Sequence, residues 1–421
     1  MYLRKFIYHI HFSFKEELKH LYLFNSLKFV LLIVFSNFTL FYIYSFGLYK
    51  LLFYLLIFYL TNSLGVFLFI KLVNIFSVEQ IFLFSFFLRI ITLVLFFYID
   101  PNEILHLILP AILQGFSNIM EWLITHYLLA FKSDKEKLSE ERALIDIINY
   151  SSKVILPFLF GLLIDFFGFK AFYLFLSLVI LFIAFYLTKK YKKSKRETII
   201  SLSIDNKIKN LILIFIVYDI AFFILFFVYI LALFELFKEK SVTNFGSFLS
   251  ISNLIVILLA LLISKRIDRI KDYGLAVLGM FLGIEALIML LFSSHNIITL
   301  MAIFIFPISL ILVEIPYSTA YYLFIRNSNV TTYLFHQFSI NFLRATFLFF
   351  LIVKNIDFKV LLLFSVFLVN LIAFIYYFFI KNFEIRVEEN EIKEKLLHEI
   401  ELRIRKSKNK EILKNIKEIN Y

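Results

Sequence analysis

Apolar side chains occupy most of the chain in long runs that short polar segments separate. The runs cover about 22–46, 49–71, 80–99, 104–131, 142–164, 169–188, 211–236, 245–264, 274–292, 297–325, 331–353 and 359–380. Each run is long enough for a helix to cross roughly 30 Å of hydrocarbon at about 1.5 Å per residue. The pattern therefore predicts an all-α integral membrane protein with twelve transmembrane helices.

A basic segment at 189–209 divides these runs into two sets of six. It holds eight Lys and Arg against two acids, Glu197 and Asp205. A polar linker between two hydrophobic halves of similar length is typical of a two-lobed transporter. We therefore expect five regions along the chain: an N-terminal interfacial lead (1–20), an N-terminal six-helix lobe (21–188), the basic linker (189–210), a C-terminal six-helix lobe (211–380) and a charged, helical, cytoplasmic tail (381–421).

The distribution of charge predicts how these helices are oriented. The formal net charge is +12, and most Lys and Arg fall in the linker, the tails and the loops on one side of the predicted membrane. Such an excess marks the cytoplasmic side, so we expect a multi-pass protein of the plasma (inner) membrane with both termini cytoplasmic. The linker cations are expected to bind anionic lipid headgroups rather than nucleic acid. We also expect a monomer and no removed signal peptide.

Charged residues inside the apolar runs recur in both halves of the chain. Three pairs are separated by nearly the same interval: Lys28 and Asp219 (219 − 28 = 191), Glu121 and Glu314 (314 − 121 = 193), and Lys153 and Arg344 (344 − 153 = 191). Near-constant offsets are expected when two six-helix halves are parallel repeats of one unit. The linker then joins two related lobes.

Two segments resemble motifs of a known family. The run 154–188 has Pro157 and Gly161 in the fifth predicted span, followed by Leu163-Ile164-Asp165 and a turn at Gly168. The segment SKRIDRIKDYG at 264–274 is similar to a loop motif, G-x-x-x-D-R-x-G-R-K, with Asp268 and Arg269 in the Asp-Arg positions. With its twelve predicted spans, the chain resembles the major facilitator superfamily of transporters.

This resemblance implies two lobes that rock around a central path lined by spans 1, 4, 7 and 10. It also implies that Asp268 and Arg269 form a charge relay that gates the cytoplasmic side. The alternative interpretation of that segment is an ordinary cytoplasmic loop made basic by Lys265, Arg266 and Lys271.

Polar side chains within the spans are the candidates for the transport path. A charge near the bilayer centre costs about 2.5–3.5 kcal/mol on insertion scales, so it should face a cavity or a partner. In the fourth span Gln114, Asn118 and Glu121 share one helical face at i, i+4 and i+7. The candidate substrate and proton-coupling residues are Asn37, Gln114, Asn118, Glu121, Lys153, Asp219, Glu314, Tyr317, Asn341 and Arg344.

Two interpretations of the charged candidates are open. In the first, Glu121, Asp219 or Glu314 exchanges protons, since burial moves a carboxyl pKa toward neutrality, and Lys153 or Arg344 holds an anionic group of the substrate. In the second, Glu121–Lys153 and Glu314–Arg344 are structural ion pairs that tie neighbouring spans together.

The sequence favours a secondary active transporter that moves a small organic solute by alternating access, coupled to protons or to another ion. A lipid or lipid-linked saccharide flippase is the alternative. A membrane-embedded enzyme is a weaker one, because the Ser and His residues are scattered and form no nucleophile or metal constellation. The nine Gly form no phosphate-binding loop, and the absence of Cys excludes disulfides and thiolate sites. No cofactor and no metal are expected.

Overall fold

The computed structural model describes residues 28, 30–100, 102–132, 138–190, 209–270, 275–292, 301–302, 304–314, 321, 330–354, 360 and 366–367. Inside these ranges the side chains of 78–79, 126–132, 138–151, 186–190, 209–211, 214, 260–270, 276, 291–292 and 330 are not described. The predicted N-terminal lead, the linker between 191 and 208, the C-terminal tail and most of the twelfth span lie outside the described residues.

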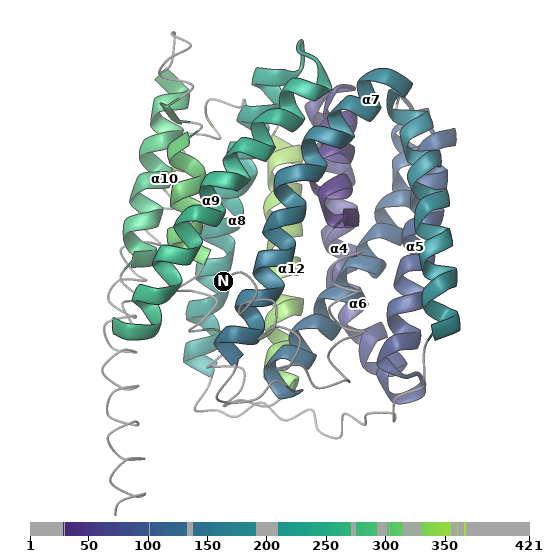
Figure 1. Cartoon of the computed structure of the whole chain (residues 1–421), viewed down its shortest axis with the longest axis horizontal. Coiled ribbons are helices and arrows are strands. Elements are labelled where there is room, and N and C mark those ends of the chain that lie inside the picture. Colours follow the sequence, from purple (N-terminus) through teal and green to yellow (C-terminus); the bar gives the residue numbers. More distant parts are fainter. Residues whose placement is uncertain are drawn as a thin grey trace, which may run out of the picture.

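Helices build the described part of the chain (Figure 1). They are η1 (Val34–Thr39, a π-helix), α3 (Leu40–Tyr44), α4 (Leu48–Ile75), α5 (Val78–Tyr98), η2 (Ile104–Leu107, a 3₁₀-helix), α6 (Ile108–Lys132), α7 (Leu138–Lys190), α8 (Lys209–Phe237), α9 (Val242–Ile270), α10 (Leu275–Phe292) and α12 (Val330–Lys354). Seven helical stretches of the described residues are long and apolar enough to cross a membrane. The all-helical architecture is confirmed, and the full count of twelve spans stays a prediction.

Local sequence explains where several helices begin and break. Gly47 precedes α4 with φ 122°, and Gly168 divides α7 into two arms with φ 77°. Glycine adopts such positive φ values without the clash that a Cβ would cause. The two arms of α7 are the fifth and sixth predicted spans, so the predicted turn at Gly168 is confirmed. The helix α5 begins with a capping box of Ser77 and Gln80.

The helix α9 extends beyond its predicted end. It continues to Ile270, so the backbone at Asp268 and Arg269 lies in its last turn. The prediction that these two residues sit in a loop is wrong, because the segment from Ser264 onward contains no Gly or Pro before Gly274 and its residues tolerate a helix. The side chains of Asp268 and Arg269 are outside the described set, so their gating role stays a prediction.

Helices from the two halves of the chain pack along each other in two long seams. Residues 28–190 form the first half and residues 209–367 the second. The helix α7 of the first half packs along α9 of the second, and α12 of the second half packs along α4 of the first. Within the halves, α6 lies against α4 and α5, and α8 contacts α10 and α12. In Figure 1, α12 lies centrally, between α8, α9 and α10 on one side and α5 and α6 on the other.

Glycines bring the backbones of α7 and α9 into direct contact. A Cβ added at Gly246 would lie 2.2 Å from the carbonyl oxygen of Pro157. A Cβ added at Gly161 would lie 2.7 Å from the carbonyl oxygen of Val242. Both obstacles are backbone atoms, which cannot rotate away as a side chain would. The α7–α9 seam therefore depends on small residues, as close helix packing in membranes commonly does.

Aromatic rings from both halves fill one end of the bundle, which we call the Gly168 end because the turn of α7 lies there, at the top of Figure 1. Phe41 stacks on Phe245 with ring centroids 4.8 Å apart and meets Phe234 edge-on at 5.5 Å. Phe38 contacts Phe160 at 6.2 Å and Phe245 at 5.8 Å. These five phenylalanines, all at most 7% exposed, are called the aromatic seal.

Candidate functional site

Arg89 of α5 and Glu121 of α6 form a buried, doubly hydrogen-bonded ion pair. Arg89 Nε donates to Glu121 Oε1 at 2.8 Å and Nη2 donates to Oε2 at 2.7 Å, with the side chains 1% and 0% exposed. The hydroxyls of Ser85 and Ser117 each donate to Glu121 Oε1 at 3.2 Å. Arg89 also lies 5.2 Å from the centre of the Phe35 ring. Such complete pairing is what a charge pair away from water requires.

The structural pair predicted between Glu121 and Lys153 is therefore wrong. Arg89 occupies both carboxylate oxygens of Glu121, and no ion pair between Glu121 and Lys153 occurs among the described side chains. A sequence signal for the real partner exists: Ser85 and Arg89 are four residues apart, so they share one face of the third predicted span. Hydropathy could not show that this face meets α6.

The other polar residues of the fourth span also point into the first half. Gln114 accepts a hydrogen bond from the hydroxyl of Tyr54 in α4. Thr125 donates to the carbonyl oxygen of Glu121 at 2.7 Å and accepts from Lys28 Nζ at 3.2 Å. The candidate site residues Asn118, also in the fourth span, and Asn37, in η1, are only partly buried. The bonds of Gln114 and Glu121 thus stabilise the first half internally.

A second titratable cluster joins α8 and α12 in the second half. His336 Nε2 lies 3.2 Å from Asp219 Oδ2, with the side chains 1% and 15% exposed. This is an ion-pair distance, although the two groups are not aligned for a hydrogen bond. His336 Nδ1 shares a 2.7 Å hydrogen bond with the hydroxyl of Tyr321, which also accepts from Gln337 Nε2 at 3.2 Å. The imidazole thus stands between a carboxylate and a phenol.

Sequence reasoning included Asp219 and noted Tyr321 as a polar residue of the tenth predicted span, but it missed His336. The available signal was weak but present: His336 directly precedes Gln337 inside an otherwise apolar helix. Buried His side chains need partners for both ring nitrogens, so its position could have suggested a polar cluster. The identity of the partner depended on the packing of α8 against α12.

Arg344 of α12 is not paired with Glu314. Its guanidinium lies over the rings of Tyr59 in α4 and Phe223 in α8, at 5.5 Å and 5.2 Å from the ring centres. Glu314 is exposed, and no Glu314–Arg344 ion pair occurs among the described side chains, so that predicted pair is wrong. Asn341 donates to the carbonyl oxygen of Gln337 at 2.7 Å, within α12. The remaining candidate, Tyr317, lies outside the described residues.

Two polar links join the halves at the Gly168 end. Asp165 of α7 accepts from the backbone N–H groups of Val242 and Thr243, at 3.0 Å and 2.8 Å, and from the Thr243 hydroxyl at 2.6 Å. It therefore satisfies free N–H groups at the start of α9 from across the seam. Tyr44 of α3 donates to Glu235 of α8 at 2.5 Å. Glu235 also binds Lys238 and thereby raises the pKa of that lysine.

This arrangement of helices agrees with the comparison to known families. The family model described as Major Facilitator Superfamily matches residues 21–343, more than three quarters of the chain. The chain belongs to the major facilitator superfamily. It is therefore a multi-pass membrane transporter, since transport is the general activity of this superfamily. No curated protein matches the chain.

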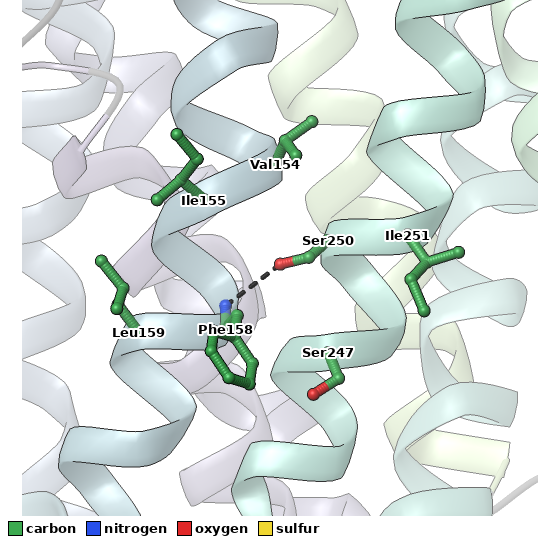
Figure 2. A pocket seen from close by; sticks show the side chains of 7 residues that line it. All are labelled: Val154, Ile155, Phe158, Leu159, Ser247, Ser250 and Ile251. Atoms are coloured by element: carbon green, nitrogen blue, oxygen red, sulfur yellow. Dashed lines mark hydrogen bonds between the residues drawn. The ribbon is translucent and has the colours of Figure 1, made fainter.

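The transporter also has a groove of about 440 Å³ between α7 and α9. Figure 2 shows its lining, which is largely apolar: Val154, Ile155, Phe158, Leu159, Ser247, Ser250 and Ile251. The hydroxyl of Ser250 accepts a hydrogen bond from the Phe158 N–H at 3.1 Å. Four of the lining side chains (Ile155, Phe158, Leu159 and Ile251) are exposed. This is a surface suited to lipid chains, and none of the predicted site residues lines it.

The candidate site of this transporter is therefore divided between its halves. Ion pairing in the first half is complete at Arg89 and Glu121. The second half holds the Asp219–His336 cluster and the stacked Arg344. In the part of the chain that the structure describes, no three His, Asp or Glu side chains gather as metal ligands would.

Proposed function

We propose that this chain is a secondary active transporter that moves a small organic solute by alternating access and couples the movement to protons. The observation that carries the proposal is the buried imidazole of His336 between Asp219 and Tyr321. It resides in the plasma (inner) membrane as a monomer with both termini cytoplasmic. The basic linker binds anionic lipid headgroups there, and Asp268 and Arg269 gate the cytoplasmic side.

Proton coupling needs a group whose charge can change inside the membrane. Histidine is the side chain whose ordinary pKa lies nearest to physiological pH. A proton on His336 completes an ion pair with Asp219, whereas its loss leaves the Asp219 carboxylate without that positive charge. Because a net charge is costly in a membrane, these two protonation states, which differ by one charge, favour different surroundings. Loading and unloading one proton can thus bias the two lobes toward different arrangements.

The side chains of Asp219 and His336 also differ in their exposure to solvent. The Asp219 side chain is partly exposed, whereas that of His336 is almost completely buried. A proton therefore reaches the pair through the carboxylate and passes to the imidazole 3.2 Å away. The Tyr321 hydroxyl on the opposite ring nitrogen fixes the ring and can exchange a hydrogen-bond role as the tautomer changes.

Glu121 has a different role in this proposal. Its two oxygens bind Arg89, and it is fully buried. A proton could reach it only by breaking the pair and leaving Arg89 as an uncompensated charge. We therefore assign Glu121 to stabilisation of the first half and the coupling proton to Asp219 and His336.

The Gly168 end supports the alternating-access part of the proposal. Rings from both halves meet there in the aromatic seal, and Asp165 and Tyr44 bond across the same end. The predicted orientation puts this end outside the cell. In this proposal the aromatic seal closes the outer side of the transporter, and the solute path opens toward the cytoplasm.

The proposal is tested with purified protein in two steps. A thermal-shift screen against metabolites and drugs first identifies a stabilising solute. Uptake of that solute is then measured in proteoliposomes under an imposed pH gradient and, separately, as exchange without a gradient. We expect Asp219→Asn and His336→Gln to lose concentrative uptake and to retain exchange. His106→Gln serves as the matched control, because His106 is exposed and its ion-pair partner among the described side chains is Glu103, three residues earlier.

The outcomes separate coupling from transport. Concentrative uptake that persists in both Asp219→Asn and His336→Gln would contradict the coupling proposal. Transbilayer movement of a fluorescent phospholipid, with no uptake of any soluble compound, would favour the flippase alternative instead.

A further inference from the structure

We infer that the transported solute carries an anionic group, a carboxylate or a phosphate, and that Arg344 binds it. The inference rests on the proposed function, since it names the substrate class for the same transport path. It starts from the way in which Arg344 differs from the other arginine described inside the spans. Arg89 has a carboxylate partner at 2.7 Å, whereas Arg344 has none among the described side chains.

Aromatic stacking compensates only part of the Arg344 charge. The guanidinium lies over Tyr59 and Phe223, so ring faces oppose its flat side by cation–π attraction. Its N–H donors, however, lie along the edge of the guanidinium plane. In the described part of the chain Arg344 Nε is buried without a hydrogen-bond partner. The packing thus holds the cation in place and leaves its donor edge available.

That edge fits a particular ligand chemistry. The guanidinium edge presents parallel N–H groups that bind a carboxylate or phosphate through two hydrogen bonds. A cationic or purely apolar solute would leave the donors unmatched. The chemistry of the site therefore selects a solute with an anionic oxygen group.

Arg344 is also placed where a transported solute would be held. It lies 14 residues after Val330 (344 − 330) and 10 before Lys354 (354 − 344), near the middle of α12. Gln337 and Asn341, on the same helical face, are both buried. Tyr59 belongs to the first half and Phe223 to the second. An anion on Arg344 would therefore lie at mid-depth, where the two halves meet.

A purely structural role for Arg344 makes a different prediction. If Arg344 only holds α4 and α8 together by stacking, its loss should lower the unfolding temperature by the same amount whichever ligand is present. If Arg344 binds substrate, its loss should remove the response to anions selectively. Selectivity between matched charged and uncharged ligands is therefore the decisive readout.

The experiment measures thermal unfolding of the full-length protein in neutral detergent. The probes are benzoate with benzamide, succinate with succinamide, and phenyl phosphate with phenol; phosphatidylglycerol micelles test whether a lipid headgroup is the source of the anion. The variants are Arg344→Gln and Arg344→Lys. Lys354→Gln is the matched control, because Lys354 is an exposed cation at the end of the same helix.

We expect at least one soluble anion to stabilise the wild type while its uncharged counterpart does not. Arg344→Gln should weaken that binding by roughly tenfold or more, because a charge-assisted pair is lost. Lys354→Gln should leave it unchanged. If Arg344→Gln does not fold, Arg344→Lys, which keeps the charge but loses the planar edge, should still weaken the anion response.

Three results would overturn the inference. They are equal stabilisation by charged and uncharged probes, unchanged anion affinity in the Arg344 variants, and stabilisation by phosphatidylglycerol alone. Failure here is distinguishable from failure of the coupling proposal. Uptake of a neutral solute that depends on His336 would contradict only the anion assignment, whereas anion binding without gradient-driven uptake would contradict only the coupling.

Discussion

The side chain of Asn253 in α9 donates a hydrogen bond to the backbone carbonyl oxygen of Lys153 in α7, at 3.1 Å. This contact compensates for a defect that Pro157 creates. Proline has no N–H, so the carbonyl four residues earlier loses its helical partner. The partner comes instead from the other half of the chain, which makes the proline a point of attachment between α7 and α9.

Replacing Asn253 should expose this dependence. Asn253→Leu removes the donor that α9 supplies to the Lys153 carbonyl, and we expect a loss of about 1–3 kcal/mol in the free energy of unfolding in detergent. Pro157→Ala restores an N–H that can bond within α7, so the same Asn253→Leu change should cost less in that background. The double-mutant cycle measures the difference. Equal costs in both backgrounds would show that the two residues are not linked.

Gly246 should tolerate no larger residue. The Cβ of Gly246→Ala would lie 2.2 Å from the Pro157 carbonyl oxygen, so α7 and α9 would have to separate. We expect a loss of about 1–3 kcal/mol, typical of overpacking, measured by thermal unfolding in detergent. Ser247→Ala is the neighbouring control, because the Ser247 hydroxyl donates to the carbonyl oxygen of Thr243 in its own helix. An alanine variant as stable as the wild type would mean that the seam can open without cost.

The Arg89–Glu121 pair should behave as a unit. Arg89→Met or Glu121→Gln alone removes one charge from a buried pair and should cost about 3–5 kcal/mol. Arg89→Met combined with Glu121→Met removes both charges, and the serines keep acceptors in the carbonyl oxygens of Phe82 and Ser85. We therefore expect the double variant to unfold at a higher temperature than either single variant. Additive losses in the double variant would contradict this role.

The link at Asp165 should hold the Gly168 end closed. Asp165→Ala removes the acceptor of three hydrogen bonds at the start of α9, and caps of this kind are worth about 0.5–2 kcal/mol. Because the chain contains no Cys, Phe41→Cys provides one thiol inside the aromatic seal. Maleimide should label that thiol faster in the Asp165→Ala background.

A graded control accompanies this labelling. Thr243→Val loses one of the three hydrogen bonds and should accelerate labelling less than Asp165→Ala does. Labelling rates that Asp165→Ala leaves unchanged would show that the seal closes without the link.

The sequence determined where most of the described helices form, although it did not show that α9 continues to Ile270. Long apolar runs have few ways to satisfy their backbone inside a membrane, so they become helices of spanning length. Gly168 could be recognised as a helix break because it lies between two apolar runs. Its backbone has a positive φ, which glycine adopts easily. The charged residues within the spans were also visible, since each is an exception in an apolar run.

The tertiary structure alone decided which of these charges meet. Helical periodicity gives the depth and face of a residue, but it does not say which helix lies opposite that face. Glu121 could have met Lys153 and instead meets Arg89, because α6 packs on α5. Arg344 could have met Glu314 and instead lies between Tyr59 and Phe223, because α12 packs on both α4 and α8. Helix neighbours are set by side-chain packing over the whole bundle, and that information is not local in the chain.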